Sequence, residues 1–147
     1  MAEPSDQQLF VPLLFNTRNR IRFAMDEAFK PLGITDATWR TLFYLSQTGD
    51  GVTQKELASV MGIEGPSLVR LLDSLEGKHF IERRPNPDDR RAKTVHLTST
   101  GRRRIVEWRT VSARVREKLL AEISAEEIQC CVDVFQRILN ASEGEPQ

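Results

Sequence analysis

Residues 52–104 decide the fold and read VTQKELASVMGIEGPSLVRLLDSLEGKHFIERRPNPDDRRAKTVHLTSTGRRR. Thr53 followed by Glu56 fits a capping box, in which each side chain bonds the other residue's backbone N–H, so it predicts a helix start. Gly62 predicts the end of this helix, because glycine readily adopts the left-handed conformation found at helix C-termini. A first short helix is therefore expected between Thr53 and Gly62.

A second helix is predicted to begin near Pro66, where the missing N–H of proline has no cost. Four leucines follow at the i, i+3, i+4, i+7 spacing of a buried helical face: Leu68, Leu71, Leu72 and Leu75. Three hydrogen-bonding side chains share the opposite face: Ser67, Arg70 and Ser74. Because Arg can pair with guanine through two hydrogen bonds and Ser can bond a base or a phosphate, this face suits the major groove. The two helices and their glycine-containing turn predict a helix-turn-helix.

Two short segments rich in β-branched or aromatic residues, 80–84 and 93–97, are predicted to form strands around the turn-rich segment 85–89. Val52 is expected to add a short third strand. Arg90 and Arg91 follow at the hairpin tip, and the negative potential of a minor groove attracts inserted arginines. Asp89 would repel phosphate at this place, so we expect its carboxylate to orient a wing arginine through a charge-assisted hydrogen bond.

Other polar residues of this stretch leave two interpretations open. Gln54 begins the first helix, where a polar side chain suits phosphate, but it could equally be an ordinary residue of a helical first turn. Arg83, Arg84 and Lys93 could hold phosphates, or they could only solvate the two strands.

The segment resembles the winged helix-turn-helix of the MarR family, and most closely its SlyA-like branch. The matching residues are Ile63-Glu64-x-Pro66-Ser67-Leu68-Val69-Arg70, Leu72-Asp73-x-Leu75-Glu76, Asp89-Arg90-Arg91-Ala92-Lys93, Leu97-Thr98 and, upstream, Lys30-Pro31-Leu32, Thr35 and Trp39. The resemblance implies a minor-groove arginine at Arg91 and base contacts from Ser67 and Arg70. It also implies a dimer formed by the terminal helices. A ligand would lie between this dimer region and the two winged helix-turn-helix units, which we call the reading heads.

The chain departs from the family pattern before the first wing strand, where His79 stands in place of a glycine with a left-handed backbone. Histidine is among the residues that tolerate this conformation. We therefore expect some loss of stability at His79 and an unchanged fold.

The expected fold is mainly α-helical with a small β-hairpin wing. Residues 1–34 are expected to form an N-terminal dimerisation helix, residues 35–98 the winged helix-turn-helix, and residues 99–147 the C-terminal dimerisation helices. Thr98 is expected to cap a helix that ends near Glu122, and at about 1.5 Å per residue this helix would exceed about 30 Å. A small winged module cannot cover the apolar stripe of such a helix, so a second copy of the chain is expected to do so. A homodimer also suits pseudo-palindromic double-stranded DNA.

Charge is distributed unevenly although the formal net charge of the 147 residues is zero. Residues 83–104 carry eight Lys or Arg against two Asp, whereas residues 122–147 carry six acids against one Arg. A basic reading module and an acidic C-terminal region are typical of nucleic-acid contact. The predicted function is therefore a sequence-specific transcriptional regulator, of the ligand-responsive repressor type. A winged-helix adaptor that binds proteins and has no specific DNA target is the alternative.

Several other classes of protein are not expected. The only histidines are His79 and His96, and the sequence has no metal-ligand spacing, nucleophile motif or phosphate-binding glycine loop, so neither an enzyme, a metal site nor a cofactor is predicted. No apolar run of membrane-spanning length and no signal peptide are seen, which predicts a cytoplasmic protein. Cys130 and Cys131 are expected to stay reduced there; a redox sensor is the less favoured alternative.

An effector site is suggested by two aromatic residues on the predicted second helix of the chain. Trp39 and Phe43 face Arg18 or Arg22 of the first helix in this interpretation, which would give ring stacking and a cationic clamp for a small aromatic carboxylate or a phenolic compound. The simpler interpretation is core packing for both rings and solvent for both arginines. Only the family resemblance favours the effector.

Overall fold

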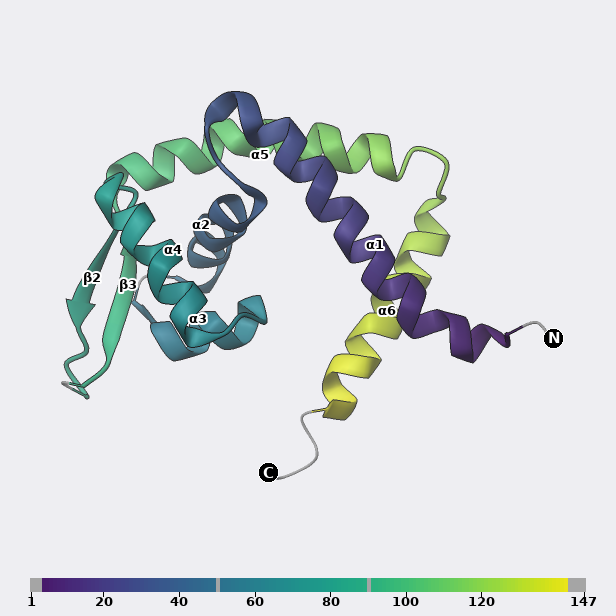
Figure 1. The fold of residues 1–147 in the computed structure, drawn as a ribbon, viewed down its shortest axis with the longest axis horizontal. Coiled ribbons are helices and arrows are strands. Elements are labelled where there is room, and N and C mark those ends of the chain that lie inside the picture. Colours follow the sequence, from purple (N-terminus) through teal and green to yellow (C-terminus); the bar gives the residue numbers. More distant parts are fainter. Residues whose placement is uncertain (1–3, 50, 90, 143–147) are drawn as a thin grey trace. The chain divides into compact units, whose positions relative to one another are not determined.

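The computed structural model describes residues 4–49, 51–89 and 91–142. The elements in chain order are α1 (Asp6–Phe29), η1 (Lys30–Leu32), α2 (Asp36–Thr48), β1 (Val52–Thr53), α3 (Gln54–Met61), α4 (Gly65–Gly77), β2 (Ile81–Pro85), β3 (Lys93–Leu97), α5 (Ser99–Leu119) and α6 (Ala125–Ser142) (Figure 1). They form two compact units, residues 1–115 and 116–147, which are described separately. The mainly helical fold with a small sheet is as predicted.

The helix-turn-helix is confirmed in detail. Thr53 and Glu56 form the expected capping box at the start of α3, and Gly62 ends that helix with a left-handed backbone at φ 61°. Pro66 lies in the first turn of α4. The buried core that α4 shares with α2, α3 and the sheet contains Leu42, Leu45, Leu57, Met61, Leu68, Leu72, Leu75, Ile81, Val95 and Leu97.

The wing is an antiparallel hairpin of β2 and β3, and β1 adds the predicted third strand on the other side of β3. Val52 pairs with Val95 and Thr53 with Thr94. Each β2 residue faces a β3 residue, from Ile81 opposite Leu97 to Pro85 opposite Lys93. The register places the segment that starts α3 beside the base of the wing.

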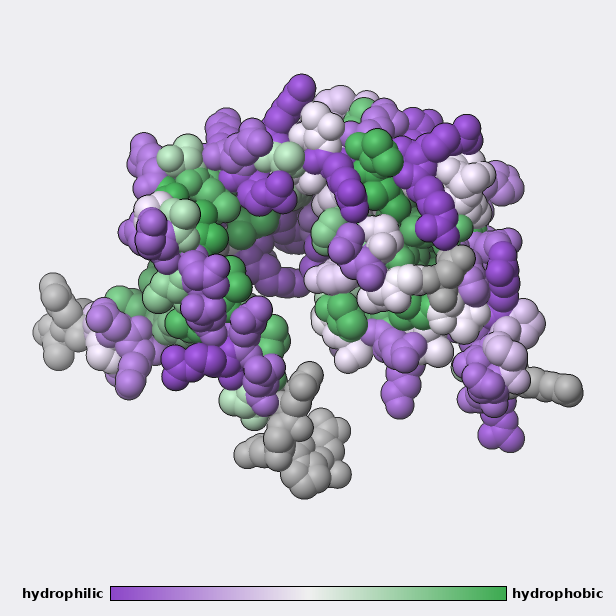
Figure 2. Space-filling model, turned by 180° about the vertical axis from the view of Figure 1, so that it is seen from behind, coloured by the Kyte–Doolittle hydropathy of each residue, from purple (hydrophilic) through white to green (hydrophobic). Residues whose placement is uncertain are grey.

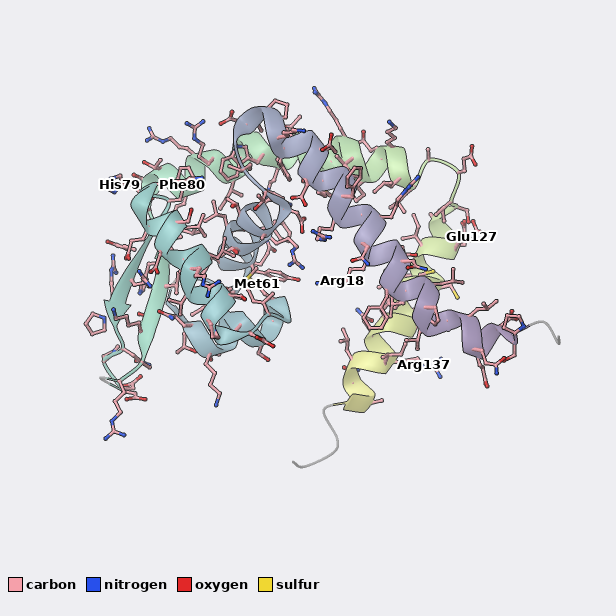
Figure 3. All side chains as sticks on the ribbon, in the orientation of Figure 1. Arg18, Met61, His79, Phe80, Glu127 and Arg137 are labelled. Atoms are coloured by element: carbon pink, nitrogen blue, oxygen red, sulfur yellow. The ribbon has the colours of Figure 1, made fainter. Side chains whose placement is uncertain are left out.

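The chain turns sharply between α4 and β2, where Figure 3 labels His79 and Phe80. His79 has a positive φ of 56°, so the left-handed backbone expected there is present. The Thr98 hydroxyl donates to the carbonyl oxygens of His79 at 2.7 Å and Phe80 at 3.1 Å, and its oxygen accepts the Gly101 N–H at 3.0 Å. Thr98 thus caps α5, as predicted, and ties that cap to the turn. The helix ends at Leu119, three residues before the predicted Glu122.

Apolar side chains reach the surface on α1 and α6, and green areas of this kind are visible between hydrophilic ones in Figure 2. On α1 the exposed large ones are Leu9, Phe10, Val11, Leu13, Leu14, Phe15, Ile21 and Phe23; on α6 they are Val132, Phe135, Ile138 and Leu139. Ser124 and Glu127 cap the start of α6, each side chain accepting the backbone N–H of the other residue. Within the described ranges, no helix is both long and apolar enough to cross a membrane.

The close approach of α5 to the α4–β2 turn gives a stability prediction. A Cβ at Gly101 would lie 2.1 Å from the carbonyl oxygen of Phe80, a backbone atom that cannot move away cheaply. Gly101→Ala should therefore lower the free energy of unfolding by about 1–3 kcal/mol, the usual cost of overpacking. Chemical denaturation of the purified protein measures it.

Gly77→Ala is the matched control, because a Cβ there meets no atom within 4 Å and the site lies in a helix. It should be neutral or stabilising by up to about 1 kcal/mol, from helix propensity. Equal stability of the Gly101→Ala protein and the wild type would contradict the contact.

Candidate nucleic-acid interface

The exposed face of α4 carries the side chains predicted to read bases. Ser67, Arg70 and Ser74 are all exposed, while the leucines of the opposite face are buried or half-buried. A helix displays residues spaced by three or four on one side, so the three polar groups form a row along α4. This row can offer hydroxyl groups and one guanidinium to a groove of DNA.

A cavity of about 620 Å³ lies between the start of α3, the middle of α4 and the wing. Its lining residues are Thr53, Gln54, Lys55, Val69, Arg83, Asn86, Asp89, Arg91, Ala92 and Lys93. Five of the residues predicted to contact DNA therefore line one hollow. Its cations and the N-terminus of α3, where a helix carries partial positive charge, suit the passage of a phosphate backbone.

Lys55 belongs to this cavity and was not among the predicted DNA contacts. It is exposed in the first turn of α3, next to Gln54. Its place could have been inferred from the sequence, because Lys55 is two residues after the N-cap Thr53 and so lies at the same helix end as Gln54.

Side chains of two tip residues accept local backbone hydrogen bonds among the described residues of the wing. The Asp89 carboxylate accepts the backbone N–H of Arg91 at 2.9 Å, and the Asn86 side-chain oxygen accepts the N–H of Asp88 at 3.1 Å. Asp89 thus fixes the chain at Arg91 through the main chain, and its predicted contact with the side chain of a wing arginine stays a prediction. Arg90, also predicted to contact DNA, lies outside the described residues.

The two arginines of β2 have different surroundings. The Arg84 side chain is exposed and pairs with Glu82 on the same strand. Only 15% of the Arg83 side chain is exposed, and its Nη2 lies 2.6 Å from Asp73 and 2.5 Å from Glu76 of α4. The hydrogen bonds from Arg83 lower the pKa of Glu76 below its ordinary value, with the side-chain bonds contributing most.

The two aromatic residues of the predicted effector site contact each other in the structure. Trp39 is 6% exposed and packs between Phe29 and Phe43, with ring centroids 5.9 and 5.3 Å away. This is the core packing that the simpler interpretation expected for Trp39. Arg18, labelled in Figure 3, is exposed on α1.

Arg22 lines a different hollow, of about 570 Å³, together with Asp26, Glu27, Lys30, Gly33, Ile34, Thr35, Asp36, Ala37 and Arg40. Trp39 and Phe43 are not among its lining residues. Asp26 accepts the backbone N–H of Asp36 at 2.7 Å and lies 3.7 Å from Arg22, so this hollow joins α1 to the start of α2.

Asp36 is a buried acid among the lining residues of this hollow. Burial raises its pKa, and Arg40, whose Nε lies 3.1 Å from the carboxylate, opposes that rise. No group of three or more His, Cys, Asp or Glu placed to hold a metal ion is found among the described residues. Ion pairs join Arg22 to Asp26, Lys30 to Glu27 and Arg40 to Asp36 in this hollow.

A row of polar groups on the second helix of a helix-turn-helix, flanked by a basic β-hairpin, defines a winged helix-turn-helix protein. A sequence model of the MarR family matches residues 32–92. The transcriptional regulator PA3341 is 37% identical, with a TM-score of 0.82, over 92% of this chain and 99% of that one. The chain belongs to the MarR family of transcriptional regulators. Its place in the SlyA-like branch stays a prediction.

Two further structures share the fold. A mutant MarR from E. coli complexed with operator DNA is 25% identical, with a TM-score of 0.78, over 92% of this chain and 99% of that one. CouR from Rhodococcus jostii RHA1 bound to p-coumaroyl-CoA is 23% identical, with a TM-score of 0.77, over 86% of this chain and 88% of that one.

The Glu76–Arg83 contact predicts how stability changes with pH. Because the pKa of Glu76 is lower in the folded protein than its ordinary 4.5, its contribution is present above about pH 4.5 and is lost as pH falls through the lowered value. The free energy of unfolding of the wild type should therefore exceed that of Glu76→Gln by more at about pH 6 than at about pH 3. Urea denaturation over this range measures the difference, and a difference independent of pH would contradict the contact.

Proposed function

We propose that the protein is a sequence-specific DNA-binding transcriptional regulator that acts as a homodimer on pseudo-palindromic operator DNA in the cytoplasm. The observation that carries the proposal is the exposed row of Ser67, Arg70 and Ser74 beside a basic cavity. The row would enter a major groove, and Arg91 would reach the neighbouring minor groove from the wing. The complex of E. coli MarR with operator DNA supports this interpretation for a related chain.

The predicted contacts take separate roles in this proposal. Ser67, Arg70, Ser74 and Arg91 would contact bases, whereas Gln54, Lys55, Arg84, Arg90 and Lys93 would hold phosphates. Phosphate contacts fix the position of a protein on the duplex and carry no direct sequence information. Asp89 would keep the wing tip in shape through its bond to the Arg91 backbone.

The dimer would form through the exposed apolar side chains of the terminal helices. Both α1 and α6 expose several large apolar residues, Phe15 and Leu139 among them. Exposed apolar surface of this extent marks an interaction site. Two recognition helices related by two-fold symmetry would then read half-sites about 34–36 Å apart.

A DNA titration tests the proposal. Arg91→Ala should weaken binding to the operator by about tenfold or more, because it removes a base contact worth about 1–3 kcal/mol. The salt dependence should also become shallower. The slope of log binding constant against log salt concentration should fall by about 0.9 for each phosphate that the variant no longer neutralises. Fluorescence anisotropy at two salt concentrations measures both, on DNA flanking the gene or on sites selected from random sequence.

Arg109→Ala is the control, since it removes an equal charge from an exposed position of α5 outside the cavity. Its operator affinity should stay close to the wild-type value. Weak wild-type binding that is the same on every sequence would overturn the proposal and favour a protein–protein adaptor.

We further propose that a small anionic aromatic effector regulates DNA binding from the hollow that Arg22 lines. CouR, a protein of the same fold, is seen bound to p-coumaroyl-CoA, which has an aromatic acyl group. The hollow joins α1 to α2, so a ligand there could bias the position of the reading head relative to the dimerisation helix. Such a ligand acts only if its affinity differs between the DNA-competent and incompetent states.

The effector prediction is tested on the operator complex. Benzoate-type and cinnamate-type carboxylates should lower the operator affinity of the wild type and lose this effect in Arg22→Ala, which lacks a cation of the hollow. Arg20→Ala, which removes a cation of the same helix that does not line the hollow, should keep the response. An operator affinity that no compound changes would reject these effector classes.

A further inference from the structure

Arg83 connects the wing to the recognition helix through four hydrogen bonds. Its Nη2 donates to Asp73 at 2.6 Å and to Glu76 at 2.5 Å, its Nε donates to Glu76 at 3.0 Å, and its backbone N–H donates to Glu76 at 2.9 Å. Asp73 and Glu76 are three residues apart on α4 and therefore lie on the same side of that helix. A single wing residue is thus held by two carboxylates of α4.

The strand explains why Arg83 faces α4. Side chains alternate between the two faces of a strand, so Arg83 points the same way as Ile81, which is buried against the core. Glu82 and Arg84 point the other way and pair with each other. β2 is an edge strand, and the Glu76 carboxylate satisfies the Arg83 N–H that does not face β3. The contact therefore covers part of an exposed strand edge.

We infer that Arg83 is a positioning residue, which holds the wing on the recognition helix, and not a phosphate contact. A phosphate would have to compete with two carboxylates for a guanidinium that is 15% exposed. Bidentate Arg–carboxylate pairs fix geometry as well as adding energy. The contact sets where Arg91 stands relative to Ser67 and Arg70, so it determines whether both grooves are read together. This inference rests on the proposed DNA-binding function.

Replacing Glu76 should change DNA affinity in the direction opposite to a simple electrostatic expectation. Removing an acid near DNA ordinarily strengthens binding, because less negative charge faces the phosphates. Glu76 of α4 and Glu82 of β2 each pair with an arginine of β2, and Glu76→Gln and Glu82→Gln remove the same charge. Glu76→Gln should nevertheless weaken operator binding by about three- to tenfold, because the wing is released. Glu82→Gln, the matched control, should bind as tightly as the wild type or slightly more tightly.

Anisotropy titrations of the full-length wild type, Glu76→Gln, Glu82→Gln and Arg83→Lys on operator DNA make the test. Arg83→Lys keeps the positive charge and removes the planar guanidinium. If Arg83 contacts phosphate, the operator affinity should change little. If Arg83 positions the wing, the operator affinity should fall about as much as in Glu76→Gln. In the Arg91→Ala background, Glu76→Gln should have little further effect, because it acts through the wing arginine that is already absent.

Hydrogen exchange without DNA provides the second readout. Backbone amides of residues 82–89 should exchange several times faster in Glu76→Gln than in Glu82→Gln, with the rest of the head unchanged. If the wild type shows no preference for any DNA sequence, the proposed function fails. The amide exchange rates still decide whether the contact of Arg83 with Glu76 holds the wing. If the wild type binds its operator and Glu76→Gln binds as tightly as Glu82→Gln, the inference is overturned.

Discussion

The burial of one face of α4 determines most of the reading head. Leu68, Leu72 and Leu75 are at most 1% exposed, and each buried leucine stabilises the fold by about 1.5–3 kcal/mol. Because these positions follow the helical repeat, burying them fixes the rotation of α4 about its axis. The polar face then points outward without any specific contact of its own. The surface proposed to read DNA is thus set by apolar packing on the other side of the helix.

Local signals allowed the elements of the head to be predicted from the sequence. The Thr53–Glu56 capping box, the left-handed backbone at Gly62 and the positive φ of His79 all depend on residues close together in the chain. A short third strand at Val52 was also predicted, and in the structure Val52 pairs with Val95 of β3. Local chemistry of this kind varies little with tertiary context, so the residue type carries the information.

Contacts between distant residues could not be predicted in the same way. Arg83 resembled the other wing cations in sequence, yet its position two residues after buried Ile81 turns it toward Asp73 and Glu76. A rule of alternation along the strand would have placed Arg83 on the inner face, but not named the carboxylates it meets. For the same reason the effector residues were grouped by type, whereas the hollow that Arg22 lines does not have Trp39 among its lining residues. The three-part domain division and the site assignments remain predictions.

Thr53 belongs to two elements at once, and this limits how the chain can vary in length. It pairs with Thr94 in the sheet, while its side chain caps α3 by accepting the Glu56 N–H. No spacer residue separates the sheet from the helix. An insertion at this junction would shift the strand by one residue and turn Val52 to the opposite face. The two-residue strand β1 therefore has to keep its length, because a change there would move both the pairing with β3 and the start of α3.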